Sequence, residues 1–175
     1  LFLKAMHSSD DATRLATTLP YAANVLVMIL IGPLADAIIS TGASRTNVRR
    51  SLQAVSLLLP GTLLLAAAYG RDDTAVVLLV SIAYGVNGVS AAGFSACLIE
   101  CCPRYSAQLV SLSNTIATVP GICAPLVVQI LTAHLGSTKE SFQIAFLLFG
   151  LAMSIPATIL FCCFFKAEDI LGTCV

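Results

Sequence analysis

The segment 31–50 reads IGPLADAIISTGASRTNVRR and concentrates Asp36, Arg45, Arg49 and Arg50 between two long uncharged runs. A carboxylate near a helix end can accept from backbone N–H groups or pair with a nearby guanidinium, so this segment can form ionic contacts between helices. Gly32, four residues before Asp36, allows another helix to approach closely. The simpler interpretation is a basic loop beside a membrane. Both interpretations stay open from these residues alone.

A second set of polar residues lies inside the uncharged runs. Asn114 and Thr115, in SLSNTIATVPG, either line a cavity that binds an anion or ordered water, or make interhelical hydrogen bonds of about 0.6–2 kcal/mol each. Asn87 lies among glycines, which favours helix packing over ligand binding. Tyr21 and Asn24 lie near one end of their run, where cavity lining and interfacial anchoring are both reasonable. These five residues are the candidates for a substrate cavity.

Other chemistry finds little support in the sequence. Intramembrane catalysts need clustered acids, His or Ser–His pairs. No predicted membrane span has a charged residue near its centre, so we do not expect an enzyme. None of the seven cysteines forms a CxxC pair with matching histidines, which argues against a metal site, and no cofactor is indicated. A formal net charge of zero gives no indication of nucleic-acid binding.

Cysteines and acids near the ends of the runs have two interpretations. The cysteines are either small apolar packing residues or, for Cys101/Cys102 and Cys162/Cys163 at predicted membrane edges, sites of S-acylation. Glu100 precedes Arg104 by four residues, a spacing that predicts a surface ion pair between them.

The elements that must position these residues are membrane-spanning helices. Hydrophobic residues make up 58% of the 175, and charged residues only 10%, against about 25% in soluble domains. The charges leave uncharged intervals of 21, 20, 26, 34 and 25 residues, and a helix needs about 20 apolar residues to cross the hydrocarbon core. The runs do not alternate polar and apolar residues as β-strands of a membrane barrel would. We therefore predict an all-α membrane protein with five spans, at about 16–38, 47–69, 74–99, 105–133 and 141–165.

Basic residues predict how these spans are oriented. The first connection holds Arg45, Arg49 and Arg50, which places it on the cytoplasmic side by the positive-inside rule. Residues 1–15 are then an extramembrane segment, or the end of a preceding helix, on the opposite side, and residues 166–175 form a cytoplasmic tail. Glycines and prolines are frequent inside the spans, including GVNGVSAAGFSA, which suits bent helices and close helix packing.

The order of motifs along the chain resembles one transporter family. G-x-x-x-D…R-R, formed by Gly32, Asp36, Arg49 and Arg50, resembles a cytoplasmic loop motif of the major facilitator superfamily. TTLPYAANVLVMILIGPLAD, NVRRSLQAVSLLLPG, GFSACLIECCPRYS and SLSNTIATVPGICAPLV are collinear with segments of its anion:cation symporter family, over residues 12–170. That family includes sialin, the vesicular glutamate transporters and the sodium–phosphate cotransporters.

The resemblance implies that the five spans are helices 8 to 12 of a twelve-helix secondary active transporter. Such a protein moves organic or inorganic anions by alternating access, with H⁺ or Na⁺ as possible coupling ions and no other cofactor. The implied partners are the lipid bilayer, a small anionic substrate and the N-terminal half of the same transporter, which we expect to be missing from this fragment. Asp36 is the acid we expect to act as a conformational switch. Plasma membrane and intracellular membranes both remain open as its location.

One stretch departs from the family pattern. Members often read G-F-x-x-N-H-x-D-I-A-P-R-Y-A where this chain reads GFSACLIECCPRYS, so Cys97 and Leu98 replace the Asn and His, and Glu100 replaces the Asp. A titratable imidazole is therefore lost, and its role cannot be carried over. This departure motivates an alternative function, a degenerate membrane scaffold that does not transport.

Overall fold

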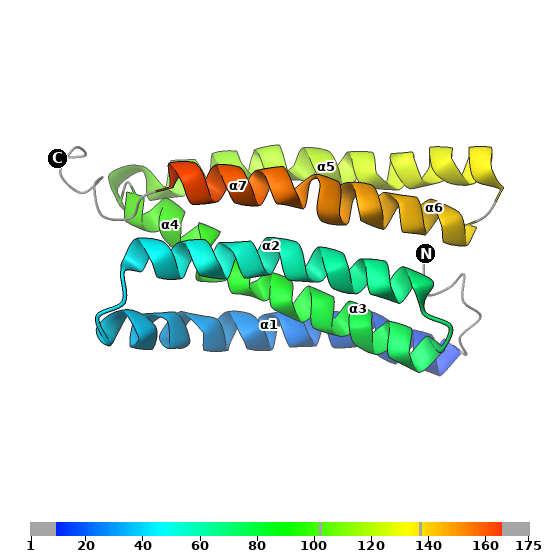
Figure 1. Ribbon diagram of the computed structural model, residues 1–175, viewed down its shortest axis with the longest axis horizontal. Helices are drawn as coiled ribbons and strands as arrows, with labels where there is room; N and C mark the ends of the chain where they lie inside the picture. The colour runs from blue at the N-terminus through cyan, green and yellow to red at the C-terminus, as the bar shows by residue number, and fades with distance from the viewer. Residues whose placement is uncertain (1–9, 102, 137, 166–175) are drawn as a thin grey trace.

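The computed structural model describes residues 10–101, 103–136 and 138–165, and these form an antiparallel helical bundle (Figure 1). Successive long helices are joined at alternate ends of the bundle. The end with the turn between the first two helices, which also holds Arg45–Arg50, is called the arginine end below. The elements, in chain order, are α1 (Asp10–Ser40), α2 (Arg45–Tyr69), α3 (Asp73–Asn87), the 3₁₀ helix η2 (Gly88–Ala91), α4 (Phe94–Cys101), the 3₁₀ helix η3 (Pro103–Tyr105), α5 (Ser106–Leu135), α6 (Thr138–Ala145), the π-helix η4 (Phe146–Ala152) and α7 (Ser154–Phe164).

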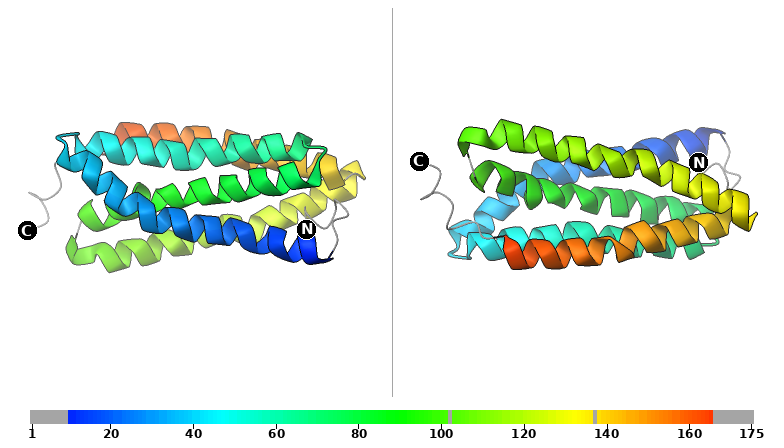
Figure 2. Two further views of the ribbon diagram at one scale, coloured as in Figure 1. Left: turned by 90° about the horizontal axis from the view of Figure 1, so that it is seen from below. Right: turned by 90° about the horizontal axis from the view of Figure 1, so that it is seen from above.

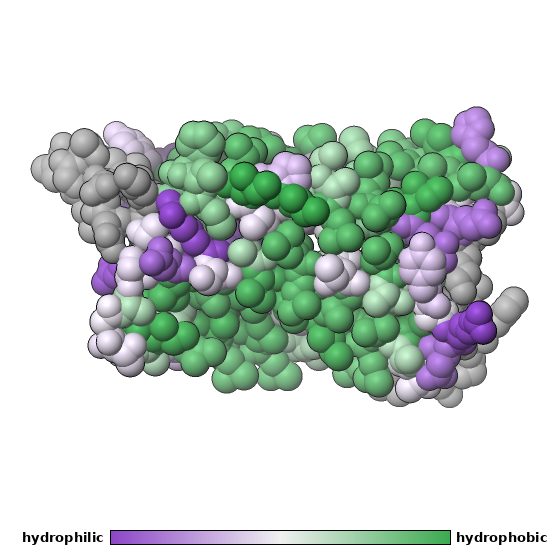
Figure 3. Space-filling view, viewed as in Figure 1, coloured by the Kyte–Doolittle hydropathy of each residue, from purple (hydrophilic) through white to green (hydrophobic). Residues whose placement is uncertain are grey.

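The predicted fold class is confirmed: the described residues contain no strand, and five helical stretches are long and apolar enough to cross a membrane. Large apolar side chains cover the outside, with Leu30 67% and Ile116 62% exposed. Such a surface is unfavourable in water and suits lipid or further helices. Figure 3 shows apolar residues over the middle of one face and hydrophilic ones at both ends. The five stretches are Thr18–Ser40, Arg45–Tyr69, Thr74–Glu100, Pro103–Leu135 and Glu140–Phe164.

Local signals explain where these helices begin and end. The α1–α2 turn contains Gly42, whose φ of +97° is disfavoured for other residues. Asp72 caps α3, because its carboxylate accepts from the Ala75 N–H at 3.2 Å. Gly136, with φ of +65°, ends α5, and its N–H donates to the Thr132 carbonyl at 3.0 Å.

Helix α2 is the centre of the bundle. Helix α3 packs between α1 and α2, while η4 and α7 pack on another side of α2 (Figures 1 and 2). Helix α5 packs mainly on α4 near the arginine end and on α6 at the opposite end, and none of its residues is buried. Buried residues recur every three or four positions along α2, as expected for one face of a helix; they include Arg49, Gln53, Ser56 and Pro60.

Two of the five spans are interrupted. The third changes from α3 through η2 to α4, around the glycines at positions 88 and 93. The fifth contains the π-helix η4, which precedes Pro156, a residue with no N–H to donate to the Ala152 carbonyl. The sequence predicts bent spans from their glycines and prolines, and the structure locates these two changes in helix type.

Helix α2 and the π-helix approach each other closely at a pair of glycines. A Cβ at Gly61 would overlap the backbone carbonyl of Gly150, and a Cβ at Gly150 would lie 3.1 Å from the Gly61 Cα. Only residues without a side chain allow this crossing, so the contact depends on both glycines.

We predict that Gly61→Ala lowers the free energy of unfolding by about 1–3 kcal/mol, because the new methyl group forces the two backbones apart. Unfolding of the detergent-solubilised protein by sodium dodecyl sulfate, followed by circular dichroism, measures this loss. Gly121→Ala is the matched control: each glycine follows a proline inside a helix, and a Cβ at Gly121 meets nothing within 4 Å. Equal stability of the two variants would contradict the prediction.

Candidate functional site

An ionic network at the arginine end joins the ends of three spans. The Arg49 side chain is buried, and its Nη2 lies 2.7 Å from Glu100 Oε1, while its Nε lies 3.4 Å from Oε2. Asp36 Oδ1 is further from the same Nη2, at 3.8 Å, and the Asp36 side chain is 74% exposed. Glu100 is therefore the main counter-ion of Arg49, and Asp36 makes a longer, solvated second contact.

Chain topology explains why these charges meet. Helix α1 ends just after Asp36, Arg49 lies in the second turn of α2, and Glu100 lies in the last turn of α4. Because successive spans run in opposite directions, all three positions fall at the same end of the bundle. A guanidinium that is buried away from water requires an opposite charge, which α4 supplies.

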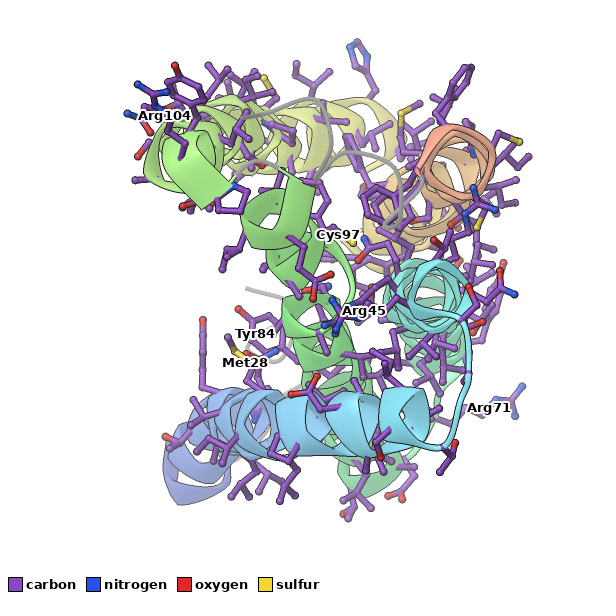
Figure 4. The ribbon with its side chains drawn as sticks, turned by 90° about the vertical axis from the view of Figure 1, so that its left-hand side faces the viewer. Met28, Arg45, Arg71, Tyr84, Cys97 and Arg104 are labelled. Carbon is purple, nitrogen blue, oxygen red and sulfur yellow. The ribbon has the colours of Figure 1, made fainter. Side chains whose placement is uncertain are left out.

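The predicted pair of Glu100 with Arg104 is wrong, since Glu100 pairs with Arg49 on another helix. Arg104 instead lies over the Tyr105 ring, with 5.7 Å between its Cζ and the ring centroid. In Figure 4 Arg104 lies at the edge of the arginine end, far from the central position of Arg45. Sequence spacing favoured the local pair, while the orientation of the spans would have placed Glu100 and Arg49 at one end.

The other two residues of the loop motif have different surroundings. Arg50 donates from Nε to the Phe165 carbonyl at 2.8 Å and also from Nη2, so it fixes the end of α7 to α2. A Cβ at Gly32 would meet no atom within 4 Å. The close helix contact expected at Gly32 is therefore not made with the part of the chain that the structure describes.

A cavity of about 400 Å³ lies beside the ionic network at the arginine end. Arg45 contributes an exposed cation to it, and Figure 4 shows this residue near the centre of the end, between α1, α2 and α4. Asp36 and Glu100 line the same space, so the cavity carries both signs of charge. The complete lining is Asp36, Ile39, Ser40, Arg45, Arg49 and Glu100.

The five substrate-cavity candidates do not gather at one place. Tyr21 and Asn24 lie where α1 meets α3: the Asn24 Nδ2 donates to the Tyr84 carbonyl at 2.7 Å, and the Tyr21 and Tyr84 rings lie 5.1 Å apart, edge to face. Asn87 is exposed further along α3. This first group therefore makes the interhelical contacts that were the competing interpretation of Tyr21 and Asn24.

Asn114 and Thr115 lie apart from that group, on exposed positions of α5. The Thr115 hydroxyl donates to the Ser111 carbonyl at 2.9 Å, within its own helix. The Asn114 carbonyl accepts from the Thr118 hydroxyl, also at 2.9 Å. The Asn114 side chain thus lies on an outer face of the described bundle, available to lipid or to another helix.

Sequence reasoning named Glu100 with the wrong partner, and it missed Gln53, which also belongs near this network. Gln53 is buried on α2, one turn after Arg49, and the Arg49 and Gln53 side chains both bind backbone groups of the interrupted third span. A polar residue inside an apolar span was the signal available for Gln53. Among the cysteines, Cys97 is buried, Cys162 is half-buried and Cys163 is exposed, while the side chains of Cys101 and Cys102 fall outside the described residues.

Comparison with curated proteins finds relatives over most of the chain. Vesicular glutamate transporter 1 of Bos taurus is 29% identical over 138 residues, which is 78% of this chain and 24% of the relative. Sialin of Homo sapiens is 30% identical over 154 residues, 87% of this chain and 30% of the relative. Vesicular glutamate transporter 2.1 of Danio rerio is 29% identical over 136 residues, 77% of this chain and 23% of the relative.

The chain is a distant homologue of the vesicular glutamate transporters and of sialin. It spans only 24% and 30% of the length of the bovine and human relatives, respectively. No family model matches it. With five helices able to cross a membrane among its described residues, this transporter homologue is a multi-pass integral membrane protein. Its relatives are transporters and not enzymes, which agrees with the prediction from the sequence.

We predict that Glu100→Gln lowers the free energy of unfolding of the transporter homologue by about 1–3 kcal/mol, because it leaves a buried guanidinium without its main counter-ion. Asp36→Asn should cost less than about 1 kcal/mol, since its ion pair is long and solvated. Chemical unfolding in detergent compares the two. A larger loss for Asp36→Asn than for Glu100→Gln would contradict this ranking.

Proposed function

We propose that the chain forms helices 8 to 12 of a twelve-helix secondary active transporter of small organic or inorganic anions. The observation that carries this proposal is the homology over 78–87% of the chain to proteins named as vesicular glutamate transporters and sialin. Glutamate, which gives several of the relatives their names, is the first substrate to test. Transport proceeds by alternating access, coupled to a gradient of H⁺ or Na⁺.

The ionic network supports a conformational role for the loop motif. Arg49 holds three spans together through Glu100 and Asp36, and it does so at one end of the bundle. The Asp36 contact is the weaker one, because the side chain is solvated and 3.8 Å away. A contact of this kind can form in one state and break in the other at little cost, which suits a switch.

The five substrate-cavity candidates form two groups, one on α5 and one on α1 and α3. Asn114 and Thr115 on α5, and Tyr21, Asn24 and Asn87 on α1 and α3, would line opposite sides of a pathway completed by helices outside this chain. The exposure of Asn87, Asn114 and Thr115 in the described bundle supports this proposal. The Asn24 bond to α3 argues that this residue acts mainly in helix packing.

The first experiment sequences the transcript upstream of the codon for Leu1 and measures uptake by its product. We expect about seven upstream spans, and uptake of one anion from glutamate, sialic acid, phosphate and nucleotides in proteoliposomes. Asp36→Asn should reduce the uptake rate several-fold at normal protein level. An intact reading frame without upstream spans, together with no uptake, would favour the degenerate scaffold, whose supporting feature is Cys97 and Leu98 in place of Asn and His.

Orientation gives a second prediction: the arginine end faces the cytoplasm. In a cysteine-free background, Ala43→Cys in the α1–α2 turn should resist a membrane-impermeant maleimide applied to intact cells and react after permeabilisation. Arg71→Cys, in the α2–α3 turn at the other end, is the matched control and should react in intact cells if the protein is in the plasma membrane. For an intracellular protein, sealed vesicles with the cytoplasmic face outward should give the reverse pattern. Reaction of both turns from the same side would overturn the topology.

A further inference from the structure

The interruption of the third span leaves backbone groups outside regular helix. Between η2 and α4, the N–H groups of Ala92 and Gly93 both donate to the Val89 carbonyl, at 3.1 and 3.2 Å. The Ala92 carbonyl and the Phe94 N–H then need partners from elsewhere. In lipid each unpaired group costs several kcal/mol, because no water is present to replace the lost bond.

Helix α2 supplies both partners. The Arg49 Nη1 donates to the Ala92 carbonyl at 2.8 Å, and the Gln53 Oε1 accepts from the Phe94 N–H at 3.0 Å. Both side chains are buried, and they lie one turn apart on the same face of α2. A donor and an acceptor are thus placed at the spacing that the interrupted backbone requires.

A close backbone approach adds to these bonds. A Cβ at Gly93 would lie 2.8 Å from the Gln53 Oε1 and 3.0 Å from the Gln53 N, so only glycine allows α2 to come this near. The same Arg49 side chain also binds Glu100 at the far end of α4. Helix α4 is therefore held by α2 at both of its ends.

The part of the bundle beyond the interruption differs from the part before it. Helix α3 packs extensively on α1 and α2, whereas α4 packs mainly on α5 and makes little contact with α2 outside these bonds. Helix α5 in turn packs mainly on α4 and α6. A change in the angle between α3 and α4 would consequently move one end of α5 while α1, α2 and α3 stay together.

We propose that Arg49 and Gln53 form a latch on the interrupted third span, and that release of this latch lets α4 swing away from α2 and carry the near end of α5. Gln53 is the positioning residue that is specific to the latch, since Arg49 also serves the ionic network. The inference goes beyond the proposed function, because it concerns a movement inside this chain and holds whatever substrate the protein carries.

Cys97 provides a natural reporter of this movement. It lies one turn after Gly93 on α4, and its side chain is only 2% exposed. When α4 moves away from the helices packed around it, the thiol becomes accessible to a small membrane-permeant reagent. With the other six cysteines replaced by serine, the rate of Cys97 modification therefore measures how often the latch opens.

The experiment measures this rate in membranes that contain the chain. Gln53→Leu removes the acceptor and should raise the rate about five- to tenfold, the factor expected for loss of one buried hydrogen bond. Gln53→Glu keeps an acceptor oxygen and should stay nearer the original rate. Gly93→Ala keeps Gln53 but pushes the backbones apart, so it should also raise the rate. It gives a second test if Gln53→Leu fails to fold.

Gln143→Leu is the matched control. Gln143 also bonds to backbone from a partly buried position, donating to the Ala68 carbonyl at 3.1 Å near the opposite end of α2. The Gln143→Leu substitution should leave the rate of Cys97 modification unchanged. An equal increase in Gln143→Leu would mean general loosening, and an unchanged rate in both Gln53→Leu and Gly93→Ala would mean that no latch exists. Either result overturns the inference without bearing on anion transport.

Discussion

The structure depends on one constraint, which is that polar groups inside lipid must find partners within the protein. The buried guanidinium of Arg49 is where this constraint is strongest. It meets the Glu100 carboxylate, the exposed Asp36 carboxylate and the Ala92 carbonyl, and so joins α2 to α1, to the residue that follows η2, and to α4. Without a carboxylate nearby, a guanidinium removed from water would be too costly to keep in this position.

The same constraint explains the central position of α2. Its side chains bind backbone groups where other helices change or end: Gln53 at the start of α4, and Arg50 at the end of α7. Further along, the Ala68 carbonyl of α2 accepts from Gln143 of α6. Close contacts at glycines also hold α2 to its neighbours. They matter because apolar side chains gain little free energy when they move from lipid into contact with one another. Interruptions in the third and fifth spans are therefore tolerated where α2 lies against them.

Helix α5 presents the opposite situation. It has no buried residue, packs mainly on two short helical segments, and carries Asn114 and Thr115 on outer positions. A helix of this kind is suited to contact something outside the described bundle, and the length of the homologous transporters leaves ample chain for that purpose. The described bundle therefore divides into a well-packed group around α2 and a loosely attached α5.

The sequence by itself determined that this protein lies in lipid, that it is helical and that it has five spans. The reason is that the number of uncharged residues between successive charges can be compared directly with the length of helix that a bilayer crossing requires. Its motif order also indicated the transporter homology. Only the tertiary structure decided that Glu100 pairs with Arg49 and not with Arg104, and that Gln53 binds the Phe94 N–H. These partners are 51 and 41 residues apart, and helix packing alone brings them together. Local spacing carries no information about such contacts, which is also why Asn24 and Asn114 could be named as polar residues but not placed.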